Sequence, residues 1–218
     1  MSLRNAVTSG LLCVLLPLAA TPAQARGLVG KGVKVGLAFS NIRGTAADLL
    51  GSDVRIGFSG GAFVTIGLGG VFQIQPELLV VTKGATSKVD LTDQAGMVIG
   101  TQDITYALDY LEIPVLARIA LPTRGSIRPS VLLGPTLGIK LRSRLGLSPA
   151  GGQPGVDLDF ITGTDLGLVV GAGADLGRGP GGFLLDARYT LGLTNVWGSP
   201  SVVEARNGTL ALMAGYGF

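Results

Sequence analysis

Two aspartates stand close together in a stretch rich in glycine and proline, and they are the residues best placed for chemistry. Asp157 and Asp159 could act as a paired acid and base, or could join Asp165 in holding Ca²⁺ through oxygen ligands. Their spacing lacks the regular pattern of a calcium-binding loop, and a solvated loop tip explains the pair more simply. We therefore predict no catalytic residue, no metal and no cofactor.

Other kinds of catalytic or nucleic-acid site are excluded by composition. The chain has no histidine, so Ser-His and Asp-His arrangements are excluded. The single cysteine, Cys13, lies in the leading segment, which leaves no thiol or disulfide chemistry after it. The formal net charge of +3 is too small to indicate a nucleic-acid partner. The sequence predicts a protein that is not an enzyme.

The first 25 residues have the pattern of a secretory signal peptide. Arg4 precedes a short apolar run over 11–20, and Ala23-Gln24-Ala25 supplies a small-residue cleavage site. The run is shorter than the about 20 residues that a spanning helix needs. We predict that residues 1–25 are removed and that residues 26–218 form one domain.

Eight stretches of the chain alternate apolar and polar residues, which is the period of a β-strand. In the last stretch, Leu210, Leu212, Tyr216 and Phe218 share one parity, and small or polar residues share the other. The other seven predicted strands cover residues 33–40, 54–66, 72–83, 106–121, 127–142, 165–176 and 183–194. Short connections alternate with long ones, the long ones over residues 41–52, 84–103, 143–164 and 195–208. This alternation is typical of membrane barrels with short periplasmic turns and long external loops.

Charged residues fall almost entirely on the parity opposite to the apolar one. An Arg or Lys facing lipid at the middle of the membrane would cost about 2–4 kcal/mol. If the apolar parity faces outward, all strand charges except Asp109 face inward, whereas a soluble barrel should show the reverse. The inward residues are Lys34, Arg55, Glu77, Glu112, Arg118, Arg128, Lys140, Arg142, Asp175, Asp186 and Arg188. The fold class that follows is all-β: an eight-stranded, antiparallel, up-and-down transmembrane β-barrel.

An eight-stranded barrel has room inside only for its own side chains. Many inward positions are glycine, which would leave space for long ionic side chains; around the predicted turn near Gly179, Gly173 should lie opposite Asp186. Buried charges are tolerated when they are paired. We therefore predict an ion network in the lumen, formed by Arg55, Glu77, Glu112, Arg118, Arg128, Asp186 and Arg188.

Aromatic residues and prolines add two further expectations. Aromatic residues gather near strand ends, as in an interfacial girdle: Phe72, Phe183, Tyr216 and Phe218 near short turns, and Trp197 in the last long loop. Prolines inside strands remove a ladder hydrogen bond, and we expect bulges at these positions. They are Pro76, Pro114, Pro129 and Pro135.

An ordered series of short motifs resembles the PorT-like family of outer-membrane β-barrel domains. The series is KGVKVGLAFS (31–40), IQPELLV (74–80), YLEIPV (110–115), LGPTLG (133–138), DLGLVVGAG (165–173), DARYTLGLT (186–194) and MAGYGF (213–218). The resemblance runs over essentially the whole chain after the leader. It implies export and an eight-stranded barrel. It also implies insertion by the barrel-assembly machinery through the last strand, whose signal would be Leu210, Leu212, Tyr216 and Phe218.

Three functions remain open. The favoured one is a non-enzymatic barrel of the bacterial outer membrane, surrounded by lipid, with a structural role or a binding role for its loops toward an envelope partner. The second is a narrow pore or a subunit of a transport or secretion complex, since some PorT-like proteins are linked to a secretion apparatus. The third is a soluble periplasmic barrel that binds a lipid-like ligand.

Overall fold

The computed structural model describes residues 27–45, 47, 53–148, 156–157, 162–177, 181–197 and 203–218. The predicted leader lies outside these residues. The strands are β1 (Gly27–Arg43), β2 (Asp53–Gly69), β3 (Phe72–Thr92), β4 (Val98–Ala120), β5 (Ile127–Ser148), β6 (Val156–Asp157), β7 (Thr164–Leu176), β8 (Gly182–Gly192) and β9 (Arg206–Gly217). Within the described residues, no helix has the length and apolar character needed to cross a membrane.

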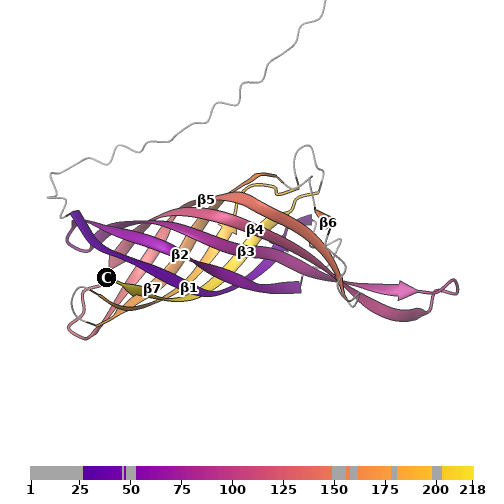
Figure 1. The fold of residues 1–218 in the computed structure, drawn as a ribbon, viewed down its shortest axis with the longest axis horizontal. Coiled ribbons are helices and arrows are strands. Elements are labelled where there is room, and N and C mark those ends of the chain that lie inside the picture. Colours follow the sequence, from indigo (N-terminus) through magenta and orange to yellow (C-terminus); the bar gives the residue numbers. More distant parts are fainter. Residues whose placement is uncertain are drawn as a thin grey trace, which may run out of the picture.

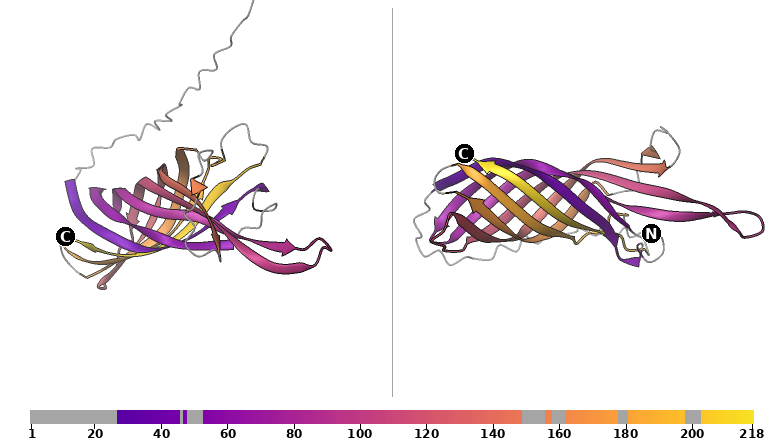
Figure 2. Two further views of the ribbon diagram at one scale, coloured as in Figure 1. Left: turned by 45° about the vertical axis from the view of Figure 1, so that its right-hand side comes forward. Right: turned by 90° about the horizontal axis from the view of Figure 1, so that it is seen from below.

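Eight of these strands form a closed antiparallel ring (Figures 1 and 2). Each long strand pairs with the next one in the chain, and β1 pairs with β9 to close the ring. The remaining strand, β6, is two residues long and pairs only with the end of β5. The predicted up-and-down barrel of eight strands is therefore confirmed, with β6 as a small addition at its rim.

The barrel has two unlike ends. The short-turn end carries the connections between β2 and β3, between β4 and β5, and between β7 and β8, as well as the start of β1 and the end of β9 (Figure 1). The long-loop end carries the other four connections. The predicted alternation of short and long connections is confirmed, with one difference in the second long connection.

Residues 84–103, which we expected to form a loop, continue β3 and β4 as a hairpin that projects beyond the barrel (Figures 1 and 2). Pairing continues to Thr92, whereas β3 last pairs with β2 at Thr86 and β4 last pairs with β5 at Asp103. The turn is closed by the Asp93 carboxylate, which accepts hydrogen bonds at 2.9 Å from the backbone N–H groups of Ala95 and Met97. The hairpin therefore has two edges without a neighbouring strand among the described residues.

Alternate residues of each strand face opposite sides of the wall. On β1, Val33, Val35 and Leu37 are about half exposed, whereas Lys34 and Ala38 are buried. The outer wall is thus apolar and the interior is mixed polar and apolar, which is the reverse of a soluble barrel.

Arg142 departs from the predicted parity. A register shift in the pairing of β4 with β5 places Asp109 opposite Arg142, and Tyr110 opposite Lys140. Because a bulge inserts one residue into one strand, the alternation is displaced beyond it. Arg142 is exposed and lies on the outer side with Asp109, so the prediction that it faces inward is wrong.

Inward glycines allow long charged side chains to fit. Gly173 pairs with Asp186, as predicted, and a Cβ at Gly173 would lie 2.6 Å from the Asp186 carboxylate. Gly171 similarly lies against Arg188, where a Cβ would approach the Arg188 Cβ to 2.5 Å. Small and large inward residues are therefore complementary on neighbouring strands.

The prolines do not produce bulges. Pro76, Pro114, Pro129 and Pro135 each have a cross-strand partner, and the register does not shift at any of them. A proline cannot donate a ladder hydrogen bond, but the neighbouring pairs keep the strands in register. The expectation of bulges at these four positions is wrong.

Candidate functional site

The lumen consists of five levels, and the inward residues of β3 mark them in order. Gln73 lies at the mouth of the short-turn end, Glu77 in a first ion cluster, Leu79 in an apolar layer and Lys83 in a second ion cluster. Ala85 lies under the cap at the long-loop end. The two-residue period of the strand therefore places one type of side chain at each level.

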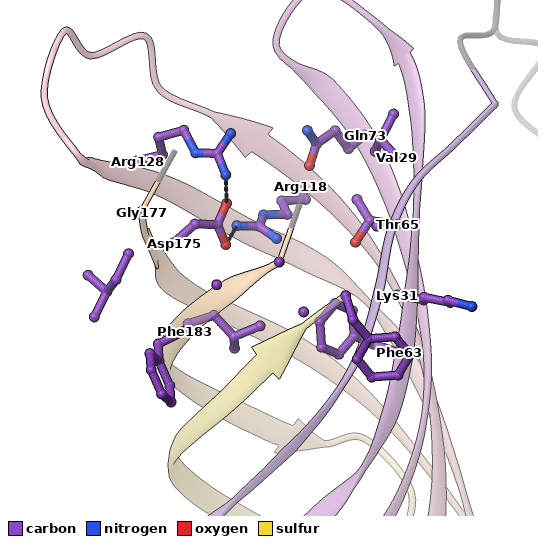
Figure 3. A pocket seen from close by; sticks show the side chains of 17 residues that line it. Val29, Lys31, Phe63, Thr65, Gln73, Arg118, Arg128, Asp175, Gly177 and Phe183 are labelled. Carbon is purple, nitrogen blue, oxygen red and sulfur yellow. Dashed lines mark hydrogen bonds and ion pairs between the residues drawn. The ribbon is translucent and has the colours of Figure 1, made fainter. Parts of the chain in front are cut away.

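The mouth contains two arginines and one carboxylate (Figure 3). Arg118 is nearly buried and donates from Nη2 to Asp175 Oδ1 at 2.6 Å. It also donates to Ser130 Oγ at 3.2 Å and to Gln75 Oε1 at 3.1 Å. Arg128 Nη2 lies 3.9 Å from Asp175 Oδ2, and half of the Arg128 side chain is exposed.

The lower ion cluster comprises Lys34, Gln75, Glu77, Asp186 and Arg188. Glu77 lies at its centre and accepts from Lys34 Nζ at 2.8 Å, Gln75 Nε2 at 2.7 Å and Arg188 Nη1 at 2.6 Å. Lys34 also donates to Asp186. All five residues are buried, and the two cations balance the two carboxylates. Charge balance and direct hydrogen bonds are the conditions under which a barrel interior can hold ions.

An apolar layer separates the two ion clusters. Ala38, Leu79 and Val81 pack together, and every one of them is at most 2% exposed. Further apolar residues pack among themselves from β4, β5 and β7: Leu116, Leu132 and Val169. A continuous file of water would have to pass this level, whose apolar side chains offer it no hydrogen bonds.

The upper ion cluster comprises Lys83, Glu112, Asp165 and Asn207. Lys83 Nζ lies 2.6 Å from Glu112 Oε1 and 3.2 Å from Asp165 Oδ2. Asn207 Nδ2 donates to Asp165 Oδ2 at 2.8 Å, and Lys83 Nζ lies 5.1 Å from the ring centre of Tyr110. The cluster joins β3, β4, β7 and β9 across the lumen.

The last loop covers the long-loop end of the lumen. Val196 and Ala205 are fully buried in a cluster with Ile42 and Ala85, and Trp197 packs against this cluster and against the one formed by Leu108 and Tyr110. Asn195 holds the loop in this shape, because its Oδ1 accepts from the backbone N–H groups of Trp197 and Ala205. The expectation that Trp197 belongs to an interfacial girdle is therefore wrong, since this ring is part of the cap.

The predicted lumen residues separate into several groups. Glu77, Asp186 and Arg188 come together in the lower ion cluster, and Glu112 lies in the upper one. Arg118 and Arg128 meet at Asp175. Arg55 forms no ion pair with a described residue; its Nη1 donates to the carbonyl of Lys83 at 2.8 Å.

Three charged members of the clusters, Lys34, Lys83 and Asp165, do not belong to the network predicted from the sequence. The sequence predicts Lys34 to face inward without a place in the network, Lys83 to end a strand and Asp165 to be at most a calcium ligand. The uncharged members Gln75 and Asn207 are also absent from that prediction. Asp165 is 2% exposed inside the lumen. Asp157 belongs to the short strand β6, and Asp159 lies outside the described residues. The sequence does contain a signal for Lys83: it has the same parity as Glu77 on the same strand, which predicts that both side chains face the lumen.

The four residues of the predicted insertion signal all face outward. Leu210, Leu212, Tyr216 and Phe218 are between 41% and 58% exposed. Tyr216 meets Phe183 edge to face, with ring centres 5.5 Å apart, and the Phe218 ring lies 5.4 Å from Lys31 Nζ. Their arrangement gives the end of β9 an apolar outer surface at the short-turn end.

The chain matches a protein-family model and several solved structures. The family model described as Outer membrane protein beta-barrel domain matches residues 23–198. Among solved structures, Neisserial surface protein A is 17% identical, with 88% of this chain and 99% of that chain covered and a TM-score of 0.48. Ail, the attachment invasion locus protein of Yersinia pestis, is 16% identical, with 87% and 98% covered and a TM-score of 0.40. Curated proteins gave no match.

Proposed function

Because this chain belongs to the outer membrane protein beta-barrel domain family, we propose that it is a non-enzymatic barrel whose lumen is filled by its own side chains. Its role is structural, or it binds an envelope partner through the long-loop end. The protein lies in the bacterial outer membrane, which sets aside the soluble periplasmic alternative. The finer assignment to the PorT-like type is part of this proposal.

The filled lumen is the observation that carries the proposal. Two ion clusters, an apolar layer between them and a cap of buried loop residues occupy successive levels of one narrow barrel. A transport role would need a wet path through all of these levels. The buried side chains of Leu79, Leu116 and Leu132, each at most 1% exposed, support a lumen without such a path.

The projecting hairpin supports a binding role for the long-loop end. Met97, Val98 and Ile99 at its tip are between 60% and 69% exposed, and no described residue covers them. The hairpin turn stands beyond the last pairing of β3 with β2 and of β4 with β5 (Figure 1). Such a tip is accessible to a partner outside the membrane.

Single-channel recording in planar bilayers tests the filled lumen. We expect the purified full-length barrel to give no discrete openings. Trp197→Ala should be equally silent, because removing one ring from the cap leaves the ion clusters and the apolar layer in place. Discrete openings in the unaltered protein would instead support the transport alternative. Openings only in the Trp197 variant would show that the cap alone closes the lumen.

Insertion of the barrel completes the proposal. We propose that the barrel-assembly machinery recognises the outer surface of β9 formed by Leu210, Leu212, Tyr216 and Phe218. The exposure of these side chains on the last strand, next to the β1–β9 seam, supports this role.

A further inference from the structure

The mouth of the short-turn end encloses a cavity that none of the roles above uses (Figure 3). Its volume is about 200 Å³, below the range of about 300–1,000 Å³ for drug-sized ligands. All eight strands of the ring contribute residues to its lining, and Phe218, which follows β9, lies among them. A small molecule could therefore enter from the periplasmic side, where the short turns of membrane barrels lie.

The cavity wall carries more positive than negative charge. Arg118 and Arg128 share one carboxylate, Asp175, so the two cations exceed it by one charge. The Lys31 side chain points away from the cavity and adds nothing to this excess (Figure 3). The Asp175 carboxylate accepts a hydrogen bond from the buried Arg118 at 2.6 Å, so Arg118 is its main partner. Its 3.9 Å separation from Arg128 is too long for a hydrogen bond.

Arg128 is consequently the side chain with spare binding capacity. A guanidinium has five N–H donors, and no hydrogen bond joins Arg128 to another described side chain. Half of its side chain is exposed, and it faces the cavity on the same side as Asp175 (Figure 3). A planar group with two oxygen acceptors would match this fork with two parallel hydrogen bonds.

The opposite side of the cavity is apolar. Phe63 is 6% exposed and lines the cavity, and Lys34 of the lower ion cluster lies 4.9 Å from the centre of its ring. Phe63 therefore separates the cavity from that cluster. Val29 and Leu184 add apolar surface, and Gln73 and Thr65 add polar atoms beside it.

We propose that this cavity binds a small carboxylate with an apolar body, the carboxylate on Arg128 and the body against Phe63. The excess positive charge of the wall favours an anion. The two parallel N–H donors of the Arg128 guanidinium favour a planar anion such as a carboxylate, and the volume of the cavity limits the size of the ligand. The site lies at the opposite end of the barrel from the loops, and it does not depend on the proposed function.

Titration with benzoate tests this site in the full-length barrel, folded in neutral maltoside micelles and followed by calorimetry. We expect saturable binding by the unaltered protein and at least roughly tenfold weaker binding by Arg128→Gln, because a charge-assisted hydrogen bond is lost. Asp175→Asn should bind benzoate more tightly, since the competing carboxylate is gone. Arg142→Gln, an exposed arginine at the other end, should bind as the unaltered protein does.

Folding is checked for each variant by its gel mobility with and without boiling. If Asp175→Asn does not fold, Arg128→Lys replaces it. Lysine keeps the charge but lacks the fork, so its affinity should fall between those of the unaltered protein and Arg128→Gln. Absence of saturable binding, or equal affinity with and without Arg128, would overturn the proposal. Tighter binding of inorganic phosphate than of benzoate would overturn the carboxylate class.

Discussion

Glu77 is the residue on which the lower ion cluster depends most. Its two oxygens accept from Lys34 on β1, from Gln75 on β3 itself and from Arg188 on β8, so two other strands are tied to this carboxylate. Removing it would leave two buried cations with one remaining carboxylate, that of Asp186. The cost of such a change comes from the uncompensated charge more than from the lost contacts.

We expect Glu77→Leu to lower the free energy of unfolding by about 3–5 kcal/mol. Urea unfolding of the barrel in lipid vesicles, followed by tryptophan fluorescence, measures this change. The control is Glu204→Leu, because Glu204 is exposed and pairs with the exposed Arg206 at 3.3 Å. Its effect should stay below about 1 kcal/mol. Similar effects for the two variants would contradict a stabilising role for the cluster.

At the scale of single residues, the sequence indicates which charges face inward but not which of them meet. Lys34 and Glu77 share the inward parity, yet they are 43 positions apart, and their contact depends on the tilt and stagger of the closed ring. The ion pair between Lys83 and Asp165 likewise depends on the closed ring, and no local sequence pattern predicts it. The inward position predicted for Arg142 is wrong because a bulge changes the parity of the strand, and no local pattern in the sequence marks that bulge.

At the scale of the strands, glycines allow close backbone approaches along the seam between β1 and β9, and the closest of these involves Gly36. Gly36 pairs with Met213, and a Cβ at Gly36 would lie 1.9 Å from the Leu212 carbonyl oxygen. A backbone atom cannot turn aside as a flexible side chain can. Only glycine allows this approach without moving one strand away from the other.

We therefore expect Gly36→Ala to lower the free energy of unfolding by about 1–3 kcal/mol and to reduce the yield of folded barrel. The fraction of protein that migrates differently before and after boiling measures that yield. Gly30→Ala is the matched control on the same strand, since its Cβ would meet nothing nearer than 3.9 Å. An equal yield for the two variants would show that the seam tolerates a side chain.

The sequence predicted the strands of the barrel wall more accurately than the projecting hairpin. In the wall, one face meets lipid and the other meets the lumen, so the alternation is strong. The hairpin from Lys88 to Gln102 has no interior, and both faces are largely exposed. Its alternation is confined to residues 88–92, and Gly96 and Gly100 resemble loop glycines. Pairing between its own two strands is what forms it.

At the scale of the whole molecule, the protein combines an apolar exterior with an ionic interior. Val35 and Leu37 of β1 are about half exposed on the outside, whereas their neighbour Lys34 is 2% exposed within. This distribution suits a bilayer, in which a lipid-facing cation is costly. Because these charged side chains are buried, they must move from water into the interior of the barrel when β1 and β9 pair and close the ring.

Phe218→Ala tests whether the outer surface of β9 guides that assembly. We expect less folded barrel in the outer membrane of cells, because the insertion signal is weakened. Refolding of the purified protein in detergent should be nearly unchanged, since the Phe218 ring is 58% exposed and its centre lies 5.4 Å from Lys31 Nζ. The boiled and unboiled gel bands give both quantities. Equal losses in cells and in detergent would indicate a purely structural role for Phe218.

The β3–β4 hairpin extends beyond the barrel, so its amino-acid sequence is constrained less by packing than the sequence of the barrel wall. Six residues separate Thr86 from Thr92, so the tip stands about 20 Å beyond the last contact with β2. Substitutions there leave the ion clusters, the seam and the lipid-facing wall untouched, and their energies add independently to that of the barrel. The surface presented to the outside world can therefore change in amino-acid sequence, or accept an inserted epitope, while the membrane anchor beneath it stays the same.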